Sequence, residues 1–169
     1  SSNSRKMNNN KVTNITTNIF DTWSKELRIT LQKIPEENIF LILEDFFITS
    51  QISNQKINQI FDLFDNKNMS HLKFWSIPKA DQIVDNYYSE YFKGAPYSVT
   101  ANGIWNKKIL LKILNDFESA WEFEINGSYR SQMYENFFGL NEKLFDFVNI
   151  VEKGKIFGLI GPNGSGKTT

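Results

Sequence analysis

An unbroken apolar run, residues 39–43, constrains this chain more than any other stretch, because two carboxylates follow it directly as Glu44 and Asp45. Five consecutive apolar residues suit a strand that is buried on both faces and are too few for a typical helix. In open α/β sheets, ligands bind just beyond the carboxyl ends of the strands. The sequence therefore predicts a central parallel strand with a ligand site at Glu44 and Asp45.

Helices and strands are predicted to alternate along the chain, in the order typical of a parallel α/β sheet. Apolar residues that recur every three or four positions after a capping side chain indicate helices, and short apolar runs indicate strands. The predicted elements are a helix capped by Asp21 or Thr22 and ending at Lys33, a strand over 39–43, a helix capped by Ser53 or Asn54, a strand over 72–77, a short strand over 97–101, a helix capped by Asn106, a short helix over 118–124 with Gly127 after it, and a last strand over 155–160. Residues 133–147 fit either a helix or a loop.

Composition restricts the class of protein. The net charge is zero, which argues against a general nucleic-acid binder. The chain has no cysteine, so it has neither a disulfide framework nor a thiolate zinc site, and its single histidine, His71, is expected to be structural. No apolar run approaches the roughly 20 residues of a membrane span, and residues 1–12 form a polar, Asn-rich lead-in that is expected to be disordered. We therefore expect a cytoplasmic protein without a transmembrane segment.

Residues 78–97 have no regular period and are rich in aromatic side chains. These side chains are Tyr87, Tyr88, Tyr91, Phe92 and Tyr97. A long aromatic loop of this kind is often a binding loop or a lid. The alternative is that the rings simply cover the sheet, and the sequence leaves both possibilities open.

Several short motifs, spread from residue 23 to residue 128, carry a resemblance to a known family. They are Trp23-Ser24-Lys25-Glu26-Leu27, Leu43-Glu44-Asp45-Phe46-Phe47, Gly103-Ile104-Trp105-Asn106 and Ser119-Ala120-Trp121-Glu122-Phe123-Glu124, followed by Gly127-Ser128. With these motifs the chain resembles bacterial glycosyltransferase-like proteins of polysaccharide gene clusters over about residues 22–155. The resemblance implies a nucleotide-sugar-binding α/β fold of the GT-A type, with helices flanking the sheet.

The same resemblance implies a metal site at Glu44 and Asp45. In such proteins a carboxylate pair after a core strand holds a divalent metal, Mn²⁺ or Mg²⁺, on the diphosphate of a nucleotide sugar. The chemistry is reasonable, because hard cations prefer carboxylate oxygens and a diphosphate leaving group needs its charge neutralised. The implied partners are a nucleotide-sugar donor and a saccharide acceptor. The alternative is that the two carboxylates merely begin a solvated loop.

Two further pairs of residues are candidates for the same reaction. Glu122 and Glu124 are two apart on a predicted helix and do not share a face, so one of them is expected to enter a cleft. That carboxylate could be the general base that deprotonates an acceptor hydroxyl. Trp105 and Trp121 could stack on a sugar or a base, and core packing is the alternative for both.

The chain departs from the family pattern at its beginning. Only about 38 residues precede the carboxylate strand, which is too few for the βαβ unit that holds the nucleotide in transferases of this architecture. We therefore expect residues 13–155 to be a glycosyltransferase-like domain that lacks most of its nucleotide-binding half, and catalysis is in question for that reason.

The C-terminal residues carry a phosphate-loop motif, in which Gly161 and four further residues precede Gly166-Lys167-Thr168. Backbone N–H groups would surround a phosphate, Lys167 would reach the outer phosphates and Thr168 would bind Mg²⁺. The residues expected to hold ATP with Mg²⁺ are Gly161, Asn163, Gly164, Ser165, Gly166, Lys167, Thr168 and Thr169. Residues 153–169 also resemble the start of an ABC-transporter ATPase domain.

Residues 156–169 hold only the first part of such a domain, because the helix that should follow the loop is missing. The dipole of that helix is a main source of phosphate affinity. We therefore expect no ATP hydrolysis from this chain alone, and interpret the join as a fusion or an incomplete gene.

Three functions stay open from the sequence. The first is an incomplete glycosyltransferase-like protein, and the second is the N-terminal fragment of an ABC-type ATP-binding protein with a membrane-transporter partner. The third is a non-catalytic interaction domain, or an unstable fragment, that uses the aromatic loop.

Overall fold

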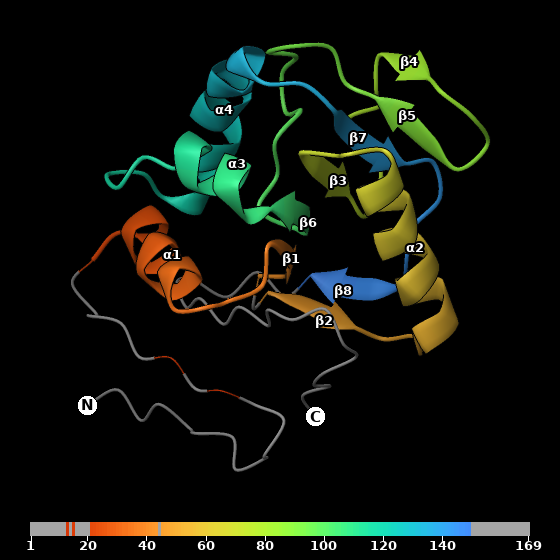
Figure 1. Ribbon diagram of the computed structural model, residues 1–169, viewed down its shortest axis with the longest axis horizontal. Helices are drawn as coiled ribbons and strands as arrows, with labels where there is room; N and C mark the ends of the chain where they lie inside the picture. The colour runs from red at the N-terminus through yellow and green to blue at the C-terminus, as the bar shows by residue number, and fades with distance from the viewer. Residues whose placement is uncertain (1–12, 14, 16–20, 44, 150–169) are drawn as a thin grey trace.

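The computed structural model describes residues 13, 15, 21–43 and 45–149, in which helices cover both faces of a mixed sheet (Figure 1). The elements are, in chain order, α1 (Trp23–Gln32), β1 (Asn38–Leu41), β2 (Phe46–Ile48), α2 (Asn54–Asn66), β3 (His71–Lys73), β4 (Gln82–Ile83), β5 (Tyr88–Glu90), β6 (Gly103–Asn106), α3 (Lys107–Ile113), α4 (Ala120–Arg130), the 3₁₀ turn η1 (Ser131–Met133), β7 (Phe137–Leu140) and β8 (Phe147–Asn149). The described residues therefore have the α/β class and the flanking helices that the sequence predicts.

Side-chain caps begin the helices, and three of these caps are confirmed predictions. The side chains of Thr22, Ser53 and Asn106 each accept a hydrogen bond from a backbone N–H in the first turn of α1, α2 and α3. Such a bond satisfies one of the N–H groups that a helix leaves without an intrahelical partner. Capping is a local interaction, which explains why the sequence was sufficient to predict it.

Helix α4 is longer than predicted, and Gly127 lies inside it rather than after its end. A Cβ atom at Gly127 would lie 3.2 Å from Ile113 Cγ2 and 3.3 Å from Val99 Cγ1. The glycine therefore allows α4 to approach α3 and the segment before β6 closely. Here glycine serves tertiary packing, whereas its usual low helix propensity suggested the end of the helix.

A capping box fixes the start of α4. The Glu122 N–H donates to Ser119 Oγ at 3.3 Å, and the Ser119 N–H donates back to Glu122 Oε2 at 2.8 Å. We expect Ser119→Ala to lower the free energy of unfolding by about 1 kcal/mol. Urea denaturation measures this change, with Ser119→Asp as the control that keeps an acceptor. Equal destabilisation by both substitutions would contradict a capping role.

The main sheet has six strands in the order β1-β6-β3-β7-β5-β4. Only β3 and β7 pair in parallel, and the other neighbours are antiparallel. The central strand β3 places His71 opposite Trp105 of β6 on one side and Phe137 of β7 on the other. Strands β2 and β8 form a separate antiparallel pair.

The predicted central parallel strand is wrong in both position and direction. Strand β1 covers Asn38–Leu41, and in the described part of the chain it pairs only with β6, antiparallel, at the edge of the sheet. Its apolar run has a different cause. Ile39 and Leu41 are buried against the core under α1, whereas the ring of Phe40 packs on the opposite face against Phe74, at 4.4 Å between ring centroids. An edge strand that is covered on both faces has the same sequence pattern as a central one.

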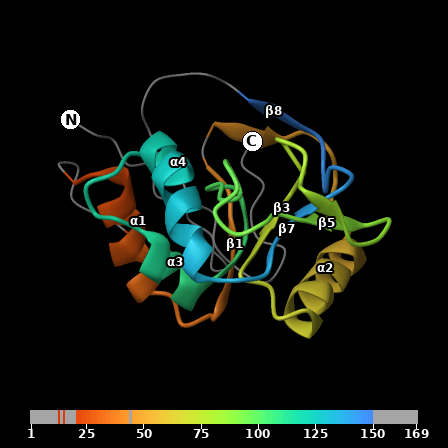
Figure 2. The ribbon, with the colours of Figure 1, turned by 90° about the horizontal axis from the view of Figure 1, so that it is seen from above.

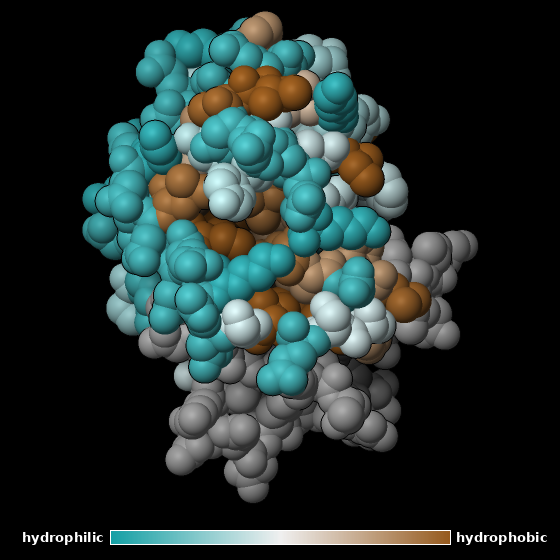
Figure 3. All heavy atoms as spheres, turned by 90° about the vertical axis from the view of Figure 1, so that its right-hand side faces the viewer, coloured by the Kyte–Doolittle hydropathy of each residue, from teal (hydrophilic) through white to brown (hydrophobic). Residues whose placement is uncertain are grey.

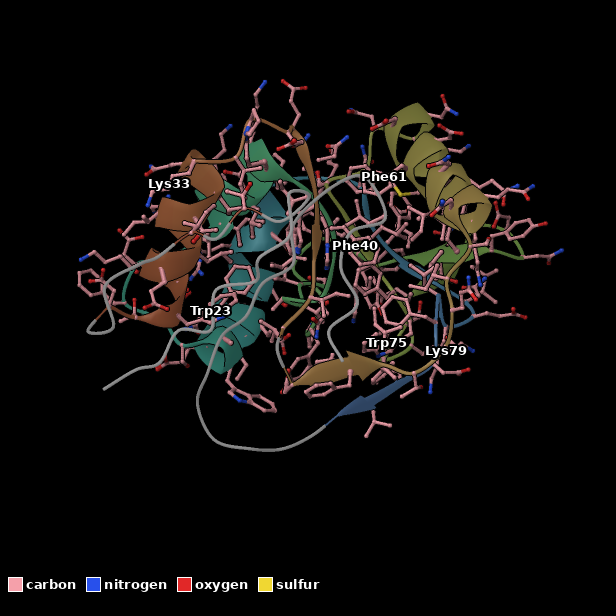
Figure 4. All side chains as sticks on the ribbon, turned by 90° about the horizontal axis from the view of Figure 1, so that it is seen from below. Trp23, Lys33, Phe40, Phe61, Trp75 and Lys79 are labelled. Carbon is pink, nitrogen blue, oxygen red and sulfur yellow. The ribbon has the colours of Figure 1, made fainter. Side chains whose placement is uncertain are left out.

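Two hydrophobic cores occupy the two faces of the sheet, and the view from above shows helices on either side of it (Figure 2). Helices α1, α3 and α4 cover one face, and α2 with the β2–β8 pair covers the other. Seen from below, Trp23 lies on the α1 side, and Phe40, Phe61 and Trp75 lie toward α2 and the β2–β8 pair (Figure 4). The sheet therefore fixes side chains of α4 and of the turn after β1 relative to one another.

The aromatic loop divides into buried and exposed rings. Tyr88 and Tyr91 are buried, so they cover the sheet, whereas Tyr87, Phe92 and Tyr97 are exposed. Residues 97–101 do not form the predicted strand, although 98, 99 and 101 are buried, and the segment instead turns tightly beneath α4.

The surface on the side of α2 and the β4–β5 hairpin is mostly hydrophilic, with hydrophobic residues in separate patches (Figure 3). None of the described helices combines the length and the apolar character that a bilayer-spanning helix requires. The predicted lead-in at residues 1–12 and the predicted strand at 155–160 lie outside the described residues.

Candidate functional site

Asp45 lies in the turn between β1 and β2, where the sequence places a ligand site. Its Oδ1 atom is buried and has no hydrogen-bond partner among the residues that the structure describes, and burial raises the pKa of this carboxyl above its usual value, against the opposing effect of its own backbone N–H. The turn is held by the Leu43 N–H, which donates to Asn102 Oδ1 at 2.7 Å. The other predicted metal ligand, Glu44, lies outside the described residues.

Glu124 of α4 is the second carboxylate of this region. Its Oε1 atom accepts a hydrogen bond of 2.9 Å from the N–H of Ala101, the residue next to Asn102. Burial raises the pKa of Glu124, while the Ala101 N–H and the charge of Lys73 lower it and the charge of Asp45 raises it. The structure thus brings Asp45 and Glu124 within electrostatic reach of one another, although 79 positions separate them in the sequence (124 minus 45).

Glu122, the alternative general base, has a different role. It is exposed on α4, and its carboxylate accepts from both the N–H and the hydroxyl of Ser119 at 2.8 Å. These hydrogen bonds hold its pKa below the usual value. The structure therefore places Glu122 in the helix cap and Glu124 at the inner edge of α4, as expected for two residues that do not share a helix face.

The two candidate stacking residues also occupy different environments. Trp105 is 0% exposed, and its Nε1–H donates to the carbonyl of Thr100 at 3.2 Å. Its ring cannot meet a substrate, so the core-packing alternative describes it. Trp121 is 78% exposed on α4, so core packing is wrong for this residue.

His71 supports the segment that carries Ala101 and Asn102. Its ring stacks on Trp105 with 3.7 Å between ring centroids. The Nδ1 atom lies 3.0 Å from the carbonyl of Ile104, and Nε2 accepts from the Thr100 N–H at 3.4 Å, so the ring is neutral with its proton on Nδ1. Complete burial lowers the pKa of His71 to about 3. The residue is structural, in keeping with the expectation.

Lys73 is a buried cation that the sequence pattern did not reveal. Its Nζ atom donates to the carbonyls of Ile77 and Tyr97 at 2.7 and 2.9 Å and to the hydroxyl of Tyr91 at 3.1 Å. Burial lowers its pKa to about 8, against the opposing effect of Glu124. Within a short strand, a lysine between apolar neighbours resembles a solvent-facing residue, and only the tertiary structure shows that it lies within electrostatic reach of Glu124.

The described residues offer few ligands for a divalent metal. Among the described residues, no group of three or more histidine, aspartate or glutamate side chains is arranged to hold a metal. The unpartnered Asp45 Oδ1 nevertheless suits a cation, because a buried acceptor without a donor is rare in proteins. Glu124 lies within electrostatic reach of Asp45, and Glu44 adjoins Asp45 in the sequence, so these carboxylates are the residues that would hold such a cation.

A separate acidic pocket lies between the start of β1 and α2. It is lined by Glu36, Glu37, Asn38, Asn58, Phe61, Asp62 and Asp65. Asp65 Oδ1 accepts from the Asn38 amide at 2.6 Å, and Lys108 Nζ lies 3.6 Å from Glu37. This pocket is open to solvent and holds none of the predicted site residues, so it is a poorer candidate than the turn at Asp45.

The chain matches no model of a protein family, and neither curated proteins nor solved structures show a match to it. The predicted phosphate-loop residues, Gly161, Asn163, Gly164, Ser165, Gly166, Lys167, Thr168 and Thr169, lie outside the described residues. Chemistry at Asp45 and Glu124 is therefore the basis for a functional proposal.

Proposed function

We propose that the chain is a glycosyltransferase-like domain of polysaccharide biosynthesis, which binds the diphosphate of a nucleotide sugar at Asp45 through Mn²⁺ or Mg²⁺. The observation that carries this proposal is the buried Oδ1 atom of Asp45, which has no hydrogen-bond partner among the described residues, with a second, half-buried carboxylate, Glu124, in electrostatic reach. A divalent cation bound there would neutralise the charge of the leaving diphosphate.

The roles of the chain's own residues follow from their environments. Asp45, with Glu44 beside it, holds the donor end of the site. Glu124 accepts the proton of an acceptor hydroxyl as the bond from its oxygen to the sugar forms and the bond from the sugar to the diphosphate breaks. A raised pKa suits a general base, since it brings the proton affinity of the carboxylate closer to working pH. The Ala101 N–H keeps Glu124 in place.

Binding of a UDP-sugar in the presence of Mn²⁺ tests this proposal. We expect the melting temperature of the full chain to rise with both ligands together, because a ligand that binds only the folded state at 100-fold excess over its Kd adds about 2.7 kcal/mol. Asp45→Asn is expected to weaken binding by about 10- to 100-fold. Glu124→Gln is expected to retain most of the binding, since it acts on the acceptor.

The matched control is Asp62→Asn, which removes a carboxylate from the acidic pocket and is exposed. It is expected to bind like the unmodified chain. A loss of binding in Asp62→Asn but not in Asp45→Asn would move the site to that pocket. No Mn²⁺-dependent shift in the unmodified chain would reject the proposal.

A second proposal comes from the motif alone. Residues 161–169 would bind the phosphates of ATP with Mg²⁺, as part of an ABC-type ATP-binding protein with a membrane-transporter partner. The same melting experiment with ATP and Mg²⁺ separates the two sites. A shift that disappears in Lys167→Ala and persists in Asp45→Asn would support this second function.

A further inference from the structure

The β1–β6 ladder ends at a point where side chains replace its hydrogen bonds. Its last pair sets Leu41 opposite Gly103, and the same register, continued by two residues, would set Leu43 opposite Ala101. These two residues do not pair with each other. The ladder therefore opens immediately before the turn that contains Asp45.

Three backbone groups of this unmade pair bond to side chains instead. The Leu43 N–H donates to Asn102 Oδ1 at 2.7 Å. The Ala101 N–H donates to Glu124 Oε1 at 2.9 Å, and the Ala101 carbonyl accepts from Trp105 Nε1 at 3.4 Å. Buried backbone groups need hydrogen-bond partners, so the two strands can separate here because these side chains supply them.

Asn102 is itself held firmly. Its side chain is buried, and its carbonyl accepts from Thr100 Oγ1 at 2.8 Å. The next residue, Gly103, lies against β3, where an added Cβ atom would clash with the His71 ring and lie 2.8 Å from the carbonyl of Leu72. An amide that is fixed in this way can hold the following turn in one position.

Asn102 and its neighbour Ala101 connect the two carboxylates of the candidate site. Asn102 binds the backbone two residues before Asp45, whereas Ala101 binds the carboxylate of Glu124 directly. The electrostatic reach between Asp45 and Glu124 agrees with this connection. Because the two contacts come from adjacent residues, the position of the Asp45 turn relative to Glu124 depends on this short segment.

We propose that Asn102 is a positioning residue of the cation site, which holds the Asp45 turn against the segment that anchors Glu124. This inference rests on the proposed function, since it concerns the same site. Residues that orient metal ligands typically change metal affinity by about 10- to 100-fold when they are replaced. Asn102 acts through the Leu43 N–H, so its effect on affinity does not require it to be a ligand.

Hydrogen exchange of the metal-free full chain tests the holding contact. Asn102→Ala is expected to speed exchange of the Leu43 amide by about 10-fold, the factor that corresponds to one net hydrogen bond. Asn102→Asp keeps an acceptor and is expected to retain slow exchange. Asn141→Ala is the matched control, because the Asn141 side chain bonds to Ser89 and to the carbonyl of Asp85 instead. Unchanged exchange of the Leu43 amide in Asn102→Ala would overturn the inference.

Titration with Mn²⁺ alone, followed by electron paramagnetic resonance, tests the effect on the site. Asn102→Ala is expected to raise the Kd for Mn²⁺ by about 10- to 100-fold, whereas Asn102→Asp and Asn141→Ala are expected to bind no more weakly than the unmodified chain. Circular dichroism checks that each variant is folded.

The two readouts separate the inference from the proposed function. Faster exchange at Leu43 with an unchanged Kd in Asn102→Ala would overturn the positioning role and leave the proposed function intact. An equal loss of affinity in Asn102→Ala and Asn102→Asp would also overturn it, because the acceptor would then not matter. An unmodified chain that binds no Mn²⁺ would reject the proposed function, and the positioning role with it.

Discussion

Trp105→Ala is expected to lower the free energy of unfolding by about 3–5 kcal/mol, the range for removing a large buried ring. Trp105 is 0% exposed and stacks on His71, and its Nε1–H bonds to the carbonyl of Thr100. The substitution leaves a cavity in the core and frees a buried carbonyl. Because domains are stable by only about 5–15 kcal/mol, urea denaturation should show a much lower midpoint.

Two further variants test whether the loss of stability comes from the buried ring. Trp105→Phe keeps an aromatic ring against His71 but removes the N–H donor, so it is expected to lose less stability than Trp105→Ala. Tyr87→Ala removes a ring that is 76% exposed and is expected to change stability by less than about 0.5 kcal/mol. Similar midpoints for Trp105→Ala and Tyr87→Ala would show that Trp105 is not the centre of this core.

Acid is expected to destabilise the fold through His71 as the pH falls from 6.5 toward 3. Burial lowers the pKa of His71 to about 3 in the folded state, whereas the unfolded chain keeps a value of 6.5. Between these values the unfolded state binds a proton that the folded state excludes. The neutral His71 therefore costs no stability above pH 6.5. Below pH 6.5 it lowers the free energy of unfolding by on the order of 1.4 kcal/mol per pH unit.

Urea denaturation at a series of pH values measures this slope. His71→Phe is the comparison, since it keeps a ring against Trp105 without a group that titrates, and its slope is expected to be clearly smaller even if its stability is lower. Asp45 and Glu124 act in the opposite direction, because their raised pKa values let the folded state bind protons more readily. Equal slopes for the two proteins would show that His71 is not the acid-sensitive group.

The parts of the fold that were predicted correctly are those set by neighbouring residues. The caps at Thr22, Ser53 and Asn106 depend on a side chain and the next three residues, and the structure has them. The pairing of β1 depends on β6, which begins more than sixty residues later, and the apolar run carries no record of that partner. The sequence therefore identified the strand but not its place in the sheet.

The residues of the candidate site also fall into those that local sequence identifies and those that depend on distant contacts. Asp45 was identified because it closely follows an apolar run, and the structure leaves its Oδ1 atom as a buried acceptor. The choice between Glu122 and Glu124 depends on contacts with Ser119 and Ala101, of which only the first is local. Lys73 was missed because its partners, the carbonyls of the nearby Ile77 and of the more distant Tyr97, leave no sequence pattern.

The strand order also determines when the pairing of the main sheet can be completed during synthesis. Strand β3 lies at the middle of the sheet, and one of its two neighbours, β7, is the last strand of that sheet to be made. At roughly 5–20 residues per second, the ribosome needs several seconds to proceed from β3 to β7. Its other neighbour, β6, is also made after β3, so β3 has both sides open until β6 is made and one side open from then until β7 is made. An unpaired strand edge is a template for pairing with another chain, so the order of synthesis leaves the middle of this sheet open to such pairing until β7 is made.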